Sequence, residues 1–255
     1  MKYFMFCLVI FSASLGANSS AGFHTIVWNV GQGQWVTVVT PLQCYHFDAG
    51  GEFFPWRKIA LQCQQKKNFL FLSHWDWDHI GALGKPAMKK YLPDVCLALA
   101  PLGRSSPRKM RILSAIQKCT ATAPLLPVNI WQPAAESPFK GSSNGLSSVT
   151  QQRGILFPGD STANEEKIWQ DLPWVARTQI LILGHHGSTT STADSLLKRL
   201  RRVRMSFSSA RWSRYRHPHS RTLARLRAAR IANLRTEDWG NIWIAQTAIY
   251  DFKKF

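Results

Sequence analysis

Short apolar runs alternate with longer amphipathic segments along this chain of 255 residues. Runs of four to six mostly apolar residues indicate buried strands, and segments with helical periodicity lie between many of them. The predicted strands are residues 24–29, 35–40, 43–47, 68–72, 95–100, 146–150, 154–157, 179–183, 203–208 and 241–246. The predicted helices are residues 80–91, 107–118, 164–172, 191–202 and 220–230, with Asn164, Ser191 and Ser220 near their N-caps. The pattern alone indicates a mixed α/β fold.

A dense group of metal-binding residue types follows one of these strands. Residues 74–79 read HWDWDH and place two His and two Asp directly after the apolar run 68–72. Because these positions cannot share one face of a strand or a helix, we expect a strand-to-helix turn on which the side chains converge. Imidazole with carboxylate suits Zn²⁺, Mn²⁺ or Fe²⁺. The alternative is a polar loop that binds no metal.

Two later strands also end at residues of this kind. The run 154–157 is followed by Pro-Gly and Asp160, and the run 179–183 is followed by Gly184, His185 and His186. Strand ends collect functional groups in layered α/β folds. Taken singly, Asp160 is a turn or cap candidate and the His pair a core candidate. Together with residues 74–79, they favour a shared metal site.

The order HxDxDH, GD, HHGS resembles the metallo-β-lactamase fold, and specifically the hydrolase domain of ComEC-type competence (DNA-uptake) proteins. Four further segments resemble that family's DVGQGD, IDTGG, NxxSL and YGHPH motifs: NVGQGQ at 29–34, FDAGG at 47–51, NGLSS at 144–148 and YRHPH at 215–219. The resemblance covers about residues 24–246. It implies a four-layer αββα sandwich in a single domain, residues 22–255. Residues 133–148 are predicted to be a flexible insertion in this domain, because they are Pro- and Ser-rich, polar and without periodicity.

Four positions depart from the family pattern. Asn29 and Gln34 stand where the family has Asp, Arg216 replaces the Gly of YGHPH, and Ala82 replaces a Gly after the first cluster. We expect these residues to lie on loops that shape the mouth of the site. They therefore bear on substrate choice and rate more than on the fold or on metal binding.

The resemblance implies two divalent metal ions, Zn²⁺ or Mn²⁺, which together would activate a water for attack on a phosphodiester. The expected ligands are His74 and Asp76 for the first metal, Asp78, His79 and His186 for the second, and Asp160 bridging both. The first metal lacks a third ligand, because Asn144 lies where related proteins often supply a His. Either His217 or His219 fills this gap or donates a proton to the leaving oxygen.

Other residues are expected to support this centre. Asp48 is expected to orient a ligand His or a loop, and His185 to contact a ligand or the substrate. Asn144, Arg214 and Arg216 are further candidates for such contacts. The residues expected to carry catalysis are Asp78, His217 and His219.

Charge is concentrated in one part of the chain. The formal net charge is +18, yet thirteen of the 32 Lys and Arg residues lie within 195–236, which contains no Asp or Glu; the remainder has 19 basic and 14 acidic residues. This basic segment surrounds YRHPH at 215–219. A basic patch beside a hydrolytic site favours a polyanion such as nucleic acid, bound with salt-dependent affinity. A solvated helix face and an anionic membrane surface are the alternatives.

Residues 1–21 are predicted to be a secretory signal peptide: Met1-Lys2, the apolar run 3–15, and a small-residue stretch with a cleavage site at 19–21. The apolar run is too short for a transmembrane helix. We expect an exported protein, periplasmic or extracellular, with no transmembrane segment in the mature chain. A retained N-terminal anchor is the alternative.

Export places four cysteines in a compartment that permits disulfides. They allow three pairings, and none has the CxxC spacing of a metal site. They are Cys44, Cys63, Cys96 and Cys119.

Hypotheses of different classes follow. The first is an exported two-metal nuclease or phosphodiesterase acting on DNA or RNA. The second is a nucleic-acid-binding protein whose altered mouth has weakened catalysis. A third is hydrolysis of a smaller phosphodiester, such as a choline phosphate, or of a lactam, which leaves the basic segment unexplained.

Overall fold

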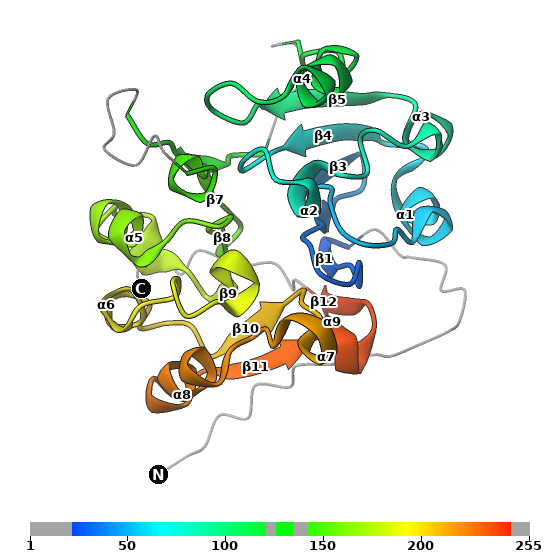
Figure 1. Cartoon of the computed structure of the whole chain (residues 1–255). Helices are drawn as coiled ribbons and strands as arrows, with labels where there is room; N and C mark the ends of the chain where they lie inside the picture. The colour runs from blue at the N-terminus through cyan, green and yellow to red at the C-terminus, as the bar shows by residue number, and fades with distance from the viewer. Residues whose placement is uncertain (1–21, 121–125, 135–141, 246–255) are drawn as a thin grey trace, which may run out of the picture.

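The computed structural model describes residues 22–120, 126–134 and 142–245, which form two six-stranded sheets (Figure 1). The first sheet has the order β12-β1-β2-β3-β4-β5 and the second has the order β11-β10-β9-β8-β7-β6. The strands of the first are β1 (His24–Val27), β2 (Val36–Val39), β3 (Gln43–Phe47), β4 (Lys67–Phe71), β5 (Val95–Leu99) and β12 (Ile242–Ala245). Those of the second are β6 (Asn129–Trp131), β7 (Val149–Gln152), β8 (Ile155–Phe157), β9 (Ile180–Ile182), β10 (Met205–Ser208) and β11 (Ala232–Arg235).

The two sheets pack face to face on an apolar core. Phe47 of β3 and Phe157 of β8 stack across it with ring centroids 3.9 Å apart. The first sheet is covered by α1 (Trp56–Cys63), α2 (Trp77–Ile80), α3 (Pro86–Tyr91) and α4 (Pro107–Ser114), and the second by α5 (Ala163–Trp169), α6 (Asp194–Arg199) and α8 (Ser220–Ala228). This arrangement is the expected αββα sandwich (Figure 1).

All ten predicted strands are present, with ends within three residues of the expected positions. The sequence pattern missed β6 and β11, two short edge strands, and also missed α1 and the short helices α7 (Trp212–Tyr215) and α9 (Thr236–Trp239). The strand β11 reads ANLR, which has too few apolar residues to indicate a strand, and its pairing with β10 stabilises the extended conformation instead.

Predicted helix 80–91 is instead two helices, α2 and α3. The helix α2 already ends at Ile80, and Pro86, the first residue of α3, keeps Lys85 before it in an extended conformation, so no continuous helix spans the predicted range. The caps of α5, α6 and α8 are Thr162, Ala193 and His219, each within two residues of the predicted position.

Disulfide bonds join Cys44 to Cys63 and Cys96 to Cys119. The first ties β3 to the end of α1, and the second ties β5 to the segment after α4. The predicted signal peptide, and residues 135–141 of the predicted insertion, lie outside the described residues. Within the described ranges, no helix has both the length and the apolarity needed to cross a membrane.

Candidate metal centre

Three turns bring the predicted ligands together, and each turn follows the carboxyl end of a strand. The segment after β4 carries His74 and Asp76 and leads into α2 with Asp78 and His79; Asp160 follows β8, and His186 lies in the 3₁₀ helix η3 (Gly184–Gly187) after β9. Gly159 has a φ of +58°, and a Cβ there would lie 2.6 Å from the Cβ of Ser73. Glycine is therefore required for the turn after β8 to approach the turn after β4.

One group of side chains surrounds His79. Its Nε2 lies 3.0 Å from Asp160 Oδ1 and 3.2 Å from His186 Nε2. The same nitrogen of His186 lies 3.2 Å from Asp78 Oδ2. These four residues match the second predicted metal set.

A second group surrounds His74. Its Nε2 lies 3.5 Å from Asp76 Oδ2 and 3.7 Å from Asp160 Oδ2. His185 Nε2 lies 3.6 Å from the same oxygen of Asp160. Asp160 therefore faces both groups, one with each carboxylate oxygen.

The donor set fits divalent metal ions. Two overlapping triads, His74 with His79 and Asp160, and Asp78 with His79 and His186, each bring three ligand atoms within 4.8 Å of one another. His74 Nε2 is buried without a hydrogen-bond partner, although a buried polar atom normally has one. A cation between these groups would supply the missing interaction.

The other ring nitrogens are held by the protein. His186 Nδ1 lies 3.0 Å from the carbonyl oxygen of Ser209, and His79 Nδ1 lies 2.7 Å from Asp48 Oδ2. Because the Nδ1–H of each ring donates to its oxygen, each ring directs its Nε2 into the cluster, and loss of the proton on that nitrogen frees it to bind a metal. This is the arrangement in which histidine binds metals.

The cluster is strongly polarised. Burial alone would raise the pKa of Asp160, but the positive charges of His79, His186 and His74 outweigh it and hold that pKa well below its usual range. Burial alone would lower the pKa of His79, yet Asp160 and Asp48 raise it well above its usual value. Binding of a cation must therefore displace protons from imidazole, and acid should weaken it.

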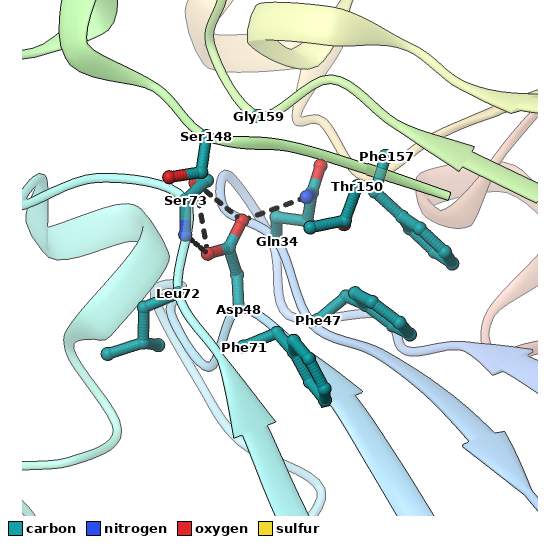
Figure 2. Close-up of a pocket in the computed structure, with 10 residues that line it drawn as sticks. All are labelled: Gln34, Phe47, Asp48, Phe71, Leu72, Ser73, Ser148, Thr150, Phe157 and Gly159. Carbon is teal, nitrogen blue, oxygen red and sulfur yellow. Dashed lines mark hydrogen bonds between the residues drawn. The ribbon is translucent and has the colours of Figure 1, made fainter. Parts of the chain in front are cut away.

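Asp48 contacts the cluster through His79, and Figure 2 shows its carboxylate between Ser73 and Gln34. Its side chain is buried and accepts hydrogen bonds from Ser73 N at 2.8 Å, Gln34 Nε2 at 2.9 Å and His79 Nδ1 at 2.7 Å. The Ser73 hydroxyl also donates to this carboxylate. The contact with His79 Nδ1 is the one through which Asp48 would orient a ligand His.

Not all the family departures lie at the mouth. Gln34 and Ala82 are buried, and Gln34 binds Asp48 beneath the cluster. The backbone N–H of Ala82 bonds the carbonyl of Ala49, so this residue helps hold α2 against the turn after β3. Arg216 is exposed, as expected of a residue at the site mouth.

His217 and His219 lie farther out than the ligand cluster. The His217 ring centroid is 6.1 Å from that of His185, and its Nδ1 lies 3.4 Å from Gln32 Nε2. Burial, and then the charge of His186, lower the pKa of His217 to about 4. His219 Nδ1 accepts from Arg221 N and caps α8. Asn144 lies 3.4 Å from His185 Nε2 through its Nδ2.

Most of the basic segment is solvent-exposed. Ten of its thirteen cations are exposed: Lys198, Arg199, Arg201, Arg202, Arg204, Arg214, Arg216, Arg221, Arg227 and Arg230. Arg214 binds Glu52 at 3.1 Å, and Arg211 binds the same carboxylate at 2.9 Å. Glu52 also accepts from Gln32 N, so it joins α7 to the loop after β1. Glu52 is not among the residues predicted for the site, and its signal in the sequence is its position directly after the FDAGG motif.

Known proteins share both the fold and stretches of the sequence. No protein-family model matches the chain. ComE operon protein 3 of Bacillus subtilis (strain 168) is 25% identical over a 272-residue alignment that covers 92% of this chain and 34% of the relative. Recombination protein 2 of Haemophilus influenzae (strain ATCC 51907 / DSM 11121 / KW20 / Rd) is 35% identical over 75 residues, 29% of this chain and 9% of the relative. The chain thus spans about a third or less of these proteins.

The solved structure of the metallo-β-lactamase fold protein YhfI from Bacillus subtilis matches with a TM-score of 0.52 at 10% identity, covering 84% of this chain and 96% of that one. The chain therefore has the metallo-β-lactamase fold, and the predicted resemblance to competence proteins of the ComEC type is confirmed.

Proposed function

We propose that this chain is a metal-dependent phosphodiesterase that hydrolyses nucleic acid. The observation that carries the proposal is the convergence of two His/Asp groups on the two oxygens of Asp160, whose nearest approaches are 3.0 and 3.6 Å. A carboxylate that faces two sets of imidazole and carboxylate donors suits a pair of divalent ions. The exposed basic segment and the similarity to a protein named for recombination support nucleic acid as the substrate class.

The metals we favour are Zn²⁺ or Mn²⁺. When bound, two such ions supply an activated water and neutralise charge on the phosphoryl group. Asp78, His79 and His186 would hold one ion, and His74 and Asp76 the other, with Asp160 between them. For the missing ligand we favour His185 over His217 and His219, because only its Nε2 reaches Asp160.

Other residues act on the substrate side of this centre. With a pKa of about 4, His217 is neutral at pH 7, so a role as proton donor is disfavoured. A neutral imidazole beside Gln32 suits a hydrogen bond to the substrate instead. We also propose export through the predicted signal peptide, which places the enzyme in contact with extracellular or periplasmic nucleic acid.

Cleavage assays test the proposed activity. Purified protein is incubated with single- and double-stranded DNA and RNA in Mn²⁺, Zn²⁺ or chelator, beside Asp78→Ala and the exposed Asp94→Ala as a matched control. We expect the wild type and Asp94→Ala to cleave, and Asp78→Ala to be inactive. Binding without cleavage above that of Asp78→Ala would instead favour the nucleic-acid-binding alternative. Turnover confined to a small phosphodiester or a lactam would reject nucleic acid as the substrate.

Metal content tests the ligand set independently of activity. Elemental analysis after dialysis is expected to give two ions per chain for the wild type and one for His185→Ala. A His217→Ala variant should keep both ions. Loss of an ion in His217→Ala but not in His185→Ala would reverse our choice of third ligand.

A further inference from the structure

An exposed tryptophan lies between two predicted ligands in the sequence. Trp77 begins α2 between Asp76 and Asp78, yet its side chain is 42% exposed. Two cations from the start of α4 lie at its ring: Arg108 Cζ is 5.4 Å and Lys109 Nζ 5.0 Å from the centroid. Of the eleven tryptophans, which are all described, only Trp77, Trp212 and Trp239 are exposed.

Trp212 forms a similar pair on the side of the second sheet. It begins α7, is 42% exposed, and has Arg216 Cζ 4.5 Å from its ring. Arg216 directly precedes His217, whose ring neighbours that of His185. The backbone N–H of Trp212 donates to Glu237, so the helix that presents the ring is fixed.

The backbone at Arg216 adds a second argument. Arg216 caps α7 in the left-handed conformation, with φ 58° and ψ 26°, which glycine adopts most readily. The family motif that YRHPH resembles has glycine at this position. An arginine here is conformationally disfavoured, and its exposed side chain gains no ion pair among the described carboxylates. Contact with a bound ligand would offset the conformational cost of an arginine at this position.

We propose that Trp77, with Arg108 and Lys109, and Trp212, with Arg216, are stacking platforms for unpaired bases on either side of the metal centre. The substrate class is then single-stranded nucleic acid. An aromatic ring stacks on any exposed base face, and neighbouring cations bind the adjoining phosphates. In a duplex the base faces are already stacked on one another, so these rings would gain nothing from it. This inference rests on the proposed function and narrows its substrate.

Equilibrium binding in chelator tests the platforms without cleavage. The probes are a fluorescein-labelled oligothymidylate and a hairpin duplex of equal charge, followed by fluorescence anisotropy. We expect the wild type to prefer the single strand, and Trp77→Leu to bind it roughly 5- to 100-fold more weakly with little change for the hairpin. Trp77→Phe retains a ring and should recover most of the affinity, whereas Leu retains only apolar surface. The exposed Trp239 provides the matched control, Trp239→Leu, with wild-type binding expected.

Trp212→Leu is expected to weaken single-strand binding in the same way. Because Trp77 lies between two predicted ligands, the metal content of Trp77→Leu is measured in parallel and should equal that of the wild type. Equal affinity for the two probes, or equal losses in the Leu and Phe variants, would overturn the stacking proposal. Failure of the proposed function is a separate result, since the wild type would then bind oligothymidylate but cleave nothing in metal.

Discussion

Replacing Asp48 with asparagine should weaken metal binding while leaving the fold intact. The side chain of asparagine has nearly the same size and shape as that of aspartate, and asparagine tolerates the positive φ of 58° at this position well. The new amide oxygen can accept from Ser73 N and Oγ, as one carboxylate oxygen does now. The new NH₂ group replaces the oxygen that accepts from Gln34 and His79.

Two adjustments can then satisfy the buried groups. Gln34 can rotate its amide to present an oxygen, and His79 can move its proton from Nδ1 to Nε2 so that Nδ1 accepts from the asparagine. The second adjustment places a hydrogen on the nitrogen that faces Asp160 and His186, and this blocks it as a ligand. Loss of such a partner typically costs 10- to 100-fold in metal affinity, or about 1.4 to 2.7 kcal/mol.

The assay is a competition titration of Zn²⁺ against a chromogenic chelator, with urea unfolding in EDTA as a check on the fold. We expect Asp48→Asn to bind 10- to 100-fold more weakly and to lose no more than about 1 to 3 kcal/mol of stability without metal. The exposed Asp94→Asn serves as control and should match the wild type in both. Wild-type Zn²⁺ affinity in Asp48→Asn would refute the argument that Asp48 sets the tautomer of His79.

Three further outcomes are expected. Burial lowers the pKa of His46 to about 4, so as pH drops from 6.5 to 4 this histidine is protonated in the unfolded chain before it is protonated in the folded one, and the free energy of unfolding falls. In urea unfolding with chelator, the wild type should lose about 2 kcal/mol more than His46→Gln between pH 7 and 4.5. Burial raises the pKa of Glu166 to about 7, so the stability that this carboxyl contributes below pH 4.5 is lost as pH rises through 7. Glu166→Gln should therefore lose about 2 kcal/mol less than the wild type between pH 5 and 8. A pH profile of stability that equals the wild type's, in either variant, would contradict the pKa shift of the residue replaced. Zn²⁺ at 100 times the dissociation constant of each site should stabilise the wild type by about 2.7 kcal/mol per bound ion and Asp160→Asn far less, measured as a shift in thermal unfolding that chelator reverses. An equal shift in both would exclude Asp160 as a ligand.

The sequence by itself determined ten of the twelve strands that build the two sheets, and the residue types of the centre. Ten strands were readable because buried strands need apolar runs, and the spacing of residues 74–79 already required a turn. The ligand candidates from three segments were predicted because each directly follows such a strand. The pairing of the cysteines was left open, since three pairings fit the same chain until β3, α1 and β5 have places in space.

Tertiary structure decided the contacts that depend on which turns meet. Gln34 was expected at the mouth, and only the packing of β2 against β3 shows it beneath the centre, bound to Asp48. His185 was expected to contact a ligand or the substrate, and the left-handed backbone of η3 decides which atom it faces, because it turns the ring of His185 toward Asp160 and that of His186 toward Asp78. Local sequence carries strand and turn preferences, because these arise from near neighbours. Distances between side chains on separate turns depend on the register and packing of both sheets, which no single segment encodes.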